Sequence, residues 1–170
     1  MNIPQTYDYL GRARRDLWAT LEAVPDEVLS KPLLNGRFHC IKDLVYHIPM
    51  VEDGWTHCTI LRDEPVLDNF SDLKDIGDSP ACSSLELGML LDYWQAVEQS
   101  TLTYLAALTD EELGRVVQDS PTDFFAVDGL LWHVMIHEIR HTSQIAVLLR
   151  MQGIKPPALD LLFYLPQAAH

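Results

Sequence analysis

Hydrophobic positions recur every three or four residues in four long segments of the chain, with polar positions between them. This period places the apolar side chains on one face of a helix. The predicted helices cover about Pro4 to Ala23, Cys40 to Leu61, Ser84 to Leu108 and Asp128 to Gln152. Proline, glycine, aspartate and serine concentrate in the stretches that separate them, as is typical of connecting loops. We therefore expect an all-α fold in which four long helices belong to a single domain over residues 1–170.

Local signals mark several helix ends and one long connection. Ser83, with a glutamate three residues later, predicts a capping box that opens the third helix, and Thr109 repeats this signal for a short helix. Pro49 lies inside the second helix and predicts a kink there. Gly153 is the expected end of the fourth helix. The acidic stretch 62–80 has no period, so we expect a long surface crossover.

The two halves of the sequence resemble each other. An offset of about 86 residues lays FHCIKDLVYHIPMVE over FFAVDGLLWHVMIHE, so that His47 meets His133 and Glu52 meets Glu138. Two related helical hairpins would explain the match. The second and fourth helices would then occupy equivalent places in the bundle, and both carry histidine there.

The balance of charge excludes several classes of partner. The chain has 25 acidic and 12 basic side chains, a net charge of -13 and a pI of about 4.7, so it would repel phosphate backbones and anionic membrane surfaces. The N-terminus lacks the apolar core of a secretory signal, and no uncharged stretch reaches the ~20 residues of a membrane span. Three cysteines without a CxxC pattern favour reduced thiols. We expect a cytoplasmic protein that binds neither nucleic acid nor a membrane.

Histidine is the candidate for chemistry, because three of the seven histidines fall within nine residues. His133, His137 and His141 are spaced four residues apart on one predicted helix, so neighbours in the series share a face. The outer pair is separated by a rise of ~12 Å, whereas two nitrogens on one metal ion lie only about 3 Å apart. Either His133 with His137 or His137 with His141 can therefore bind one ion. His47, on another amphipathic helix, is the natural third ligand.

The other histidines and Glu138 complete the candidates. We expect the remaining three histidines, His39, His57 and His170, to be surface groups. His137 to His141 also spells HExxH, the zinc protease signature, but no further glutamate follows and no edge strand is evident for a peptide. A protease is therefore not expected. Glu138 is a candidate catalytic residue that could contact a metal-bound water, or it could hold Arg140 at the surface.

Three sequence patterns carry a resemblance to a known family. The second helix reads Leu44-Val45-Tyr46-His47-Ile48 with Glu52 and Trp55, and the fourth reads Leu130-Leu131-Trp132-His133, His137-Glu138, His141 and Gln144-Ile145. The chain then continues with Leu149, Arg150, Gly153, Pro156 and Asp160. In these patterns the chain resembles the DinB/YfiT-like superfamily of metal-dependent enzymes.

The resemblance implies a fold, a metal site and partners. It implies a four-helix bundle of up-down-down-up order and a divalent metal ion, most often nickel or zinc, held by His47, His137 and His141. It thereby chooses between the two histidine pairs that spacing left open. His133, Trp55 and Trp132 would then be neighbours of the ligands or walls of a pocket. Members are commonly homodimers, several are transferases that use bacillithiol, mycothiol or glutathione, and the superfamily is associated with stress response.

Three functions follow as hypotheses. A three-histidine site leaves coordination positions open, and an open divalent ion can deprotonate a thiol or lower the pKa of water towards ~7. The leading hypothesis is transfer of a low-molecular-weight thiol to a small electrophilic substrate. The second is metal-dependent hydrolysis with Glu138 as the base. The third is a non-catalytic, stress-related metal-binding dimer, whose site would be fully ligated by protein and would have no adjoining pocket.

Overall fold

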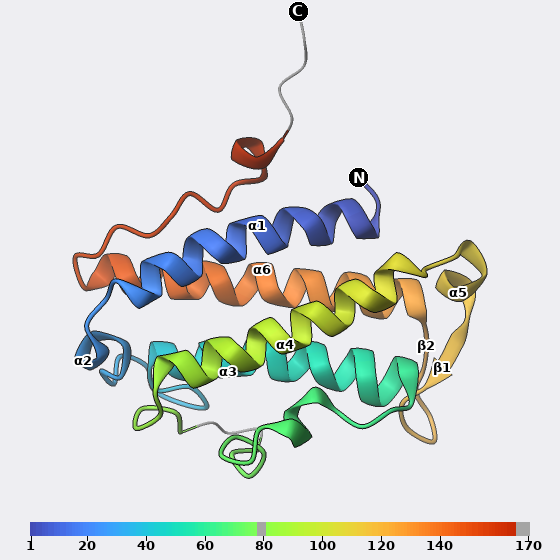
Figure 1. The fold of residues 1–170 in the computed structure, drawn as a ribbon, viewed down its shortest axis with the longest axis horizontal. Coiled ribbons are helices and arrows are strands. Elements are labelled where there is room, and N and C mark those ends of the chain that lie inside the picture. The colour runs from blue at the N-terminus through green and yellow to red at the C-terminus, as the bar shows by residue number, and fades with distance from the viewer. Residues whose placement is uncertain (78–80, 166–170) are drawn as a thin grey trace, which may run out of the picture.

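Four long helices that pack side by side form the body of the molecule (Figure 1). We describe the protein from a computed structural model. The structure describes residues 1–77 and 81–165. The long helices are α1 (Ile3–Glu22), α3 (Ile41–Asp53), α4 (Leu87–Ala106) and α6 (Val127–Met151). Shorter elements connect them: α2 (Asp26–Leu29), η1 (Gly54–Leu61), η2 (Val66–Asn69), α5 (Asp110–Gly114), β1 (Val116–Gln118), β2 (Phe124–Ala126) and η3 (Leu161–Tyr164).

The order of the bundle is up-down-down-up. In Figure 1, α1 and α6 run in one direction and α3 and α4 run in the other. The long connection between η1 and α4 returns along the bundle, which allows α3 and α4 to lie parallel. The all-α four-helix bundle predicted from the sequence is therefore confirmed, together with its long crossover.

The first helix begins at a reciprocal cap. The Asn2 side chain accepts a hydrogen bond of 3.0 Å from the Gln5 backbone amide, and the Gln5 side chain accepts one of 3.1 Å from the Asn2 amide. These bonds satisfy two donors that the first turn leaves free. The helix then buries an apolar stripe that includes Leu10, Leu17 and Leu21. The predicted first helix differs from the observed one by one residue at each end.

The second predicted helix is continuous but changes its winding. It keeps α-helical geometry through Pro49 and becomes a wider π-helix over Gly54–Leu61, five residues after the proline. Arg62 ends it in the left-handed conformation, with φ of 59°. The change of winding therefore begins at Gly54, and the kink at Pro49 stays a prediction.

Two expectations about the second half need correction. The third helix begins at Leu87, where Glu86 occupies the cap position without a side-chain hydrogen bond, so the capping box predicted at Ser83 is wrong. The structure also contains a pair of three-residue antiparallel strands, β1 and β2, that the sequence did not suggest. Only Val117 of these strands is buried, and so few residues leave no detectable alternation. The cap at Thr109 is confirmed, because its hydroxyl accepts a 3.2 Å hydrogen bond from the Glu112 amide.

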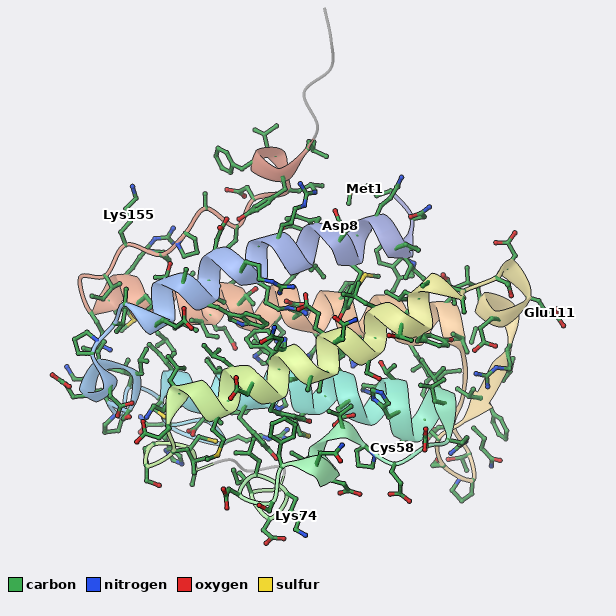
Figure 2. All side chains as sticks on the ribbon, in the orientation of Figure 1. Met1, Asp8, Cys58, Lys74, Glu111 and Lys155 are labelled. Atoms are coloured by element: carbon green, nitrogen blue, oxygen red, sulfur yellow. The ribbon has the colours of Figure 1, made fainter. Side chains whose placement is uncertain are left out.

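The interior consists of two apolar clusters with a charged group between them. One contains Leu17 and Leu21 of α1, and the other contains Tyr7 and Leu10 of the same helix. Arg14 lies between these positions and is 1% exposed. Figure 2 shows charged side chains such as Glu111 and Lys155 pointing away from the bundle. No helix in the described ranges is long and apolar enough to cross a membrane.

Candidate metal centre

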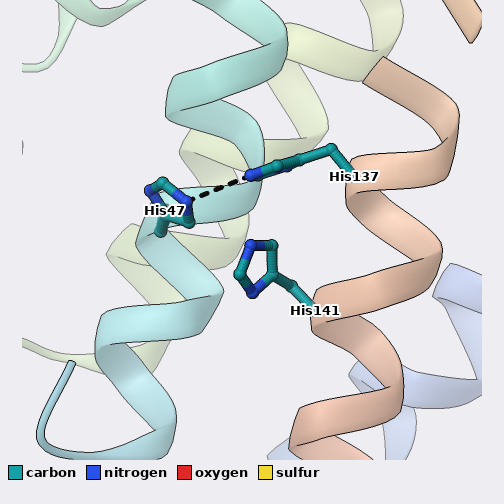
Figure 3. A group of neighbouring side chains, drawn as sticks. All are labelled: His47, His137 and His141. Carbon is teal, nitrogen blue, oxygen red and sulfur yellow. Dashed lines mark hydrogen bonds between the residues drawn. The ribbon is translucent and has the colours of Figure 1, made fainter. Parts of the chain in front are cut away.

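Three histidines meet where α3 faces α6. His137 and His141 lie one helical turn apart on α6, as their spacing predicts, and His47 approaches them from the middle of α3 (Figure 3). Because α3 packs against α6, one imidazole from α3 can face two from α6. The structure thus brings together the three residues that the family resemblance implied as ligands.

The three rings are close enough to bind a single ion. Nε2 of His47 lies 3.1 Å from Nε2 of His137, the separation expected of two ligands on one metal (Figure 3). One nitrogen from each of the three residues lies within 4.8 Å of the other two. The ring centroid of His141 is 4.4 Å from that of His137 and 4.9 Å from that of His47. No other group of at least three His, Cys, Asp or Glu side chains in the described ranges has such a geometry.

Burial keeps these imidazoles neutral. Desolvation, followed by the charge of His141, lowers the pKa of His47 to about 4. Desolvation likewise lowers the pKa of His137 to about 3, with His141 and His47 adding to the shift. The pKa of His141 is also lowered by burial, against the opposing hydrogen bond with Gln144. A neutral imidazole has a lone pair available for a metal, so the site is ready to bind one at neutral pH.

Hydrogen bonding around the rings also fits a metal. The Gln144 side-chain oxygen lies 2.6 Å from Nδ1 of His141, so Nδ1 donates the hydrogen and Nε2 retains the lone pair. In the tautomers that carry their hydrogen on Nδ1, His47 and His137 present two facing Nε2 lone pairs 3.1 Å apart with no hydrogen between them. A divalent cation satisfies all three lone pairs. Three imidazoles are suitable for zinc or nickel.

A cavity of about 720 Å³ adjoins the three histidines. His47, His137 and His141 line it, and apolar walls come from Phe38, Met50, Val51 and Trp55. His133 also lines the cavity, with its ring centroid 5.6 Å from that of Trp55 and 6.0 Å from that of His137. Trp132 does not line it and packs against the apolar cluster that contains Leu10. Of the three neighbours that the resemblance implied, Trp55 and His133 therefore line the cavity and Trp132 does not.

The chain is similar in sequence to one protein family and in fold to a solved structure. The model of the DinB family matches residues 1–169. The chain belongs to the DinB family. A solved structure described as the conserved protein of a locus from Enterococcus faecalis has a similar fold, with a TM-score of 0.70, 19% identity, and coverage of 89% of this chain and 97% of that one. At this identity the likeness concerns the fold alone, and a search of curated proteins finds no match.

In this DinB chain Glu138 faces away from the cavity. Its carboxylate pairs with Arg14, whose Nε lies 2.9 Å from one oxygen and whose Nη2 lies 2.6 Å from the other. Arg14 also lies 3.1 Å from Glu98 and 3.8 Å from Glu52. We name these four side chains the buried ion cluster. Glu138 is therefore a partner of Arg14, and neither of the roles considered for it from the sequence, at a metal-bound water or beside Arg140, matches its position.

The buried ion cluster joins all four long helices of the DinB bundle. It takes Arg14 from α1, Glu52 from α3, Glu98 from α4 and Glu138 from α6. Sequence reasoning missed it, although two signals were present. Arg14 interrupts the apolar stripe of the first helix, and the internal repeat aligns Glu52 with Glu138. Helix periodicity shows which face is buried, but it does not show which charges from different helices meet there.

Of the two described histidines that the sequence assigned to the surface, His57 is the one that the structure contradicts. It is buried in η1, with Nδ1 2.8 Å from Asp53 and Nε2 2.6 Å from the Ser100 hydroxyl. The Asp53 carboxylate raises the pKa of His57, against the effect of burial. This carboxylate compensates the burial of a polar ring, which an apolar pattern cannot predict. His39 is exposed as expected, and His170 lies outside the described residues.

Proposed function

We propose that this DinB protein is a metal-dependent enzyme that transfers a low-molecular-weight thiol to a small electrophilic substrate. The observation that carries the proposal is that the three histidines form part of the wall of a 720 Å³ cavity. A non-catalytic metal site was expected to be closed, with no adjoining pocket. An accessible site of this size instead fits small-molecule substrates.

His47, His137 and His141 would hold the ion, which can be zinc or nickel. When bound, a divalent ion lowers the pKa of a thiol that ligates it and so makes the thiolate available at neutral pH. The side chains of Phe38, Met50, Val51 and Trp55 exclude water from the adjacent space and provide contacts for an apolar electrophile. In the overall reaction the sulfur forms a bond to the electrophilic carbon, the leaving group departs with its electron pair, and the thiol proton passes to solvent.

Hydrolysis is less well supported by the geometry. The general base considered for it was Glu138, which pairs with Arg14 and does not line the cavity. Asp119 is the one carboxylate among the described lining residues, and one of its oxygens already accepts a 3.1 Å hydrogen bond from the Thr59 hydroxyl. The arrangement therefore favours an externally supplied nucleophile over water activated by a protein carboxylate.

The test is a transfer assay with the metal-loaded protein, a panel of thiols and a chromogenic electrophile. We expect a rate above that of the free thiol for the native protein, and its loss in His137→Ala. His133→Gln is the matched control, because His133 lies on the same helix and lines the same cavity but is not one of the three converging ligands. It should retain metal and transfer activity. No acceleration with any thiol, in protein shown to contain zinc or nickel, would reject thiol transfer.

A further inference from the structure

The cavity beside the three histidines has a distribution of charge unlike that of the rest of the protein. Two of the chain's 12 basic side chains, Arg37 and Arg140, line it, although the protein as a whole carries a net charge of -13. Asp119 is the only acidic residue among the described lining residues. The cavity is thus locally basic on a strongly acidic molecule.

The two arginines approach the histidines from different elements. Arg37 precedes α3, and its guanidinium carbon lies 5.4 Å from the ring centroid of Phe38, which in turn stacks 4.6 Å from the ring of His47. Arg140 lies on α6 immediately before His141. Both arginines line the same cavity as His47 and His141, which places the two side chains at the same site.

Arg140 has no carboxylate partner in the described part of the chain. Most other arginines of the protein have one: Arg12 pairs with Asp8, Arg14 and Arg15 with Glu98, and Arg115 with Glu112. In a chain with twice as many acidic as basic side chains, a lining arginine without an acidic partner is a readily available anion site.

The charges also divide the cavity along its length. Antiparallel packing puts His47 of α3 near His141 of α6, and puts Trp55 near His133, whose rings are 5.6 Å apart. His47 and Trp55 are separated by eight residues, a rise of roughly 12 Å along a helix. Arg37 and Arg140 belong to the end with His141, whereas Thr59 and Asp119 belong to the end beyond Trp55. A bound molecule would therefore be oriented, with its negative end at the arginines.

We propose that Arg37 and Arg140 form an anion subsite next to the three histidines, and that the small molecule used by this site carries a carboxylate or another anionic group within reach of them. The molecule's apolar part lies along Met50, Val51 and Trp55. This inference rests on the proposed function in so far as the anionic molecule is a thiol or its electrophile. The low-dielectric walls strengthen the attraction, and the acidic exterior adds to selectivity because anions have few other places to bind.

Calorimetric titration with small probes tests this subsite. The probes are 2-mercaptoethanol, which is a neutral thiol, 3-mercaptopropionate, which adds a carboxylate, and 2-mercaptoethanesulfonate, which adds a tetrahedral oxyanion. Propionate is titrated into metal-free protein as an anion without a thiol. We expect each anionic thiol to bind the zinc-loaded protein at least about fivefold more tightly than the neutral thiol, the factor that one exposed ion pair provides at its upper range. A larger factor for the carboxylate or for the sulfonate identifies the preferred anion.

A charge-matched pair of variants provides the control. R37Q/R140Q removes both lining arginines and should abolish the preference for anionic thiols, leaving 2-mercaptoethanol binding within about twofold of native. R12Q/R150Q removes the same charge from α1 and α6 outside this cavity and should keep the preference. Equal binding of neutral and anionic thiols by the native protein, or equal preference in the two double variants, would overturn the subsite and leave thiol binding intact. Binding of propionate through the arginines, with no thiol binding to the zinc-loaded protein, would instead reject thiol transfer and support the subsite.

Discussion

Replacing Arg14 with methionine removes the single cation of the buried ion cluster. Its side chain is 0% exposed and pairs with three carboxylates, two of them at 3.1 Å or less. Methionine preserves the apolar part of the side chain, so the loss is mainly electrostatic. Removing one partner from a buried ion pair costs about 3–5 kcal/mol, because it leaves charge buried without compensation. We expect R14M to lower the free energy of unfolding by that amount at pH 7.

The pH dependence of this loss follows from the pKa values. Burial raises the pKa of Glu52, and Arg14 opposes that rise, so removing Arg14 raises it further. A carboxyl group whose pKa is higher in the folded state binds its proton on folding, which makes the folded state relatively more stable as pH falls. The difference between R14M and the native protein should therefore shrink between pH 7 and pH 5.

Equilibrium unfolding in urea at several pH values measures both effects. R12M is the matched control, because Arg12 lies on the same helix but its side chain is 51% exposed and pairs with an exposed aspartate. It should change the free energy of unfolding by less than about 0.5 kcal/mol. The reasoning is refuted if R14M is no less stable than R12M, or if the loss caused by R14M grows as pH falls.

Two further predictions concern other buried groups. Asp53→Ala should lower the free energy of unfolding in urea by about 3 kcal/mol, because the carboxylate accepts hydrogen bonds from two backbone amides and from the Tyr93 hydroxyl. Asp68→Ala is the control and should change this free energy little, because Asp68 is exposed. Equal effects of the two substitutions would contradict this role of Asp53. In metal-free protein, His47 has a pKa of about 4 when folded and about 6.5 when unfolded, so only the unfolded state binds its proton between these values. Native stability should therefore fall about 1.5 kcal/mol more than that of His47→Leu between pH 6.5 and pH 5, and parallel pH profiles of the two proteins would argue against a neutral buried imidazole.

Local sequence patterns predicted the positions of the helices well. They predicted poorly which polar groups far apart in the sequence contact one another. Apolar periodicity located all four long helices because each buries one face against the others. It did not predict the start of α4 at Leu87, where the cap residue Glu86 makes no side-chain hydrogen bond that a capping pattern could reveal. It also did not distinguish the π-helical turns over Gly54–Leu61 from regular α-helix.

The histidine site also combines a local pattern, which the sequence revealed, with a long-range contact, which it did not reveal by spacing alone. Spacing on one helix restricted the ligands to two pairs, and the family resemblance chose His137 with His141. The position of His47 across the interface brings these three side chains together. The buried ion cluster needed four helices to be placed before Glu138 could be assigned to Arg14. Homodimer formation and a link to stress response stay predictions.

Metal analysis of the purified protein is the most direct test of the histidine site. After loading with zinc or nickel and exhaustive dialysis, we expect one ion per chain in the native protein and in His133→Ala, and nearly none in His137→Ala. His133 lines the same cavity without joining the three converging ligands, so the comparison separates ligation from a general disturbance of α6. Circular dichroism on the same samples should show equal helix content. Equal metal content in native protein and His137→Ala would contradict the assignment of His47, His137 and His141 as a metal site.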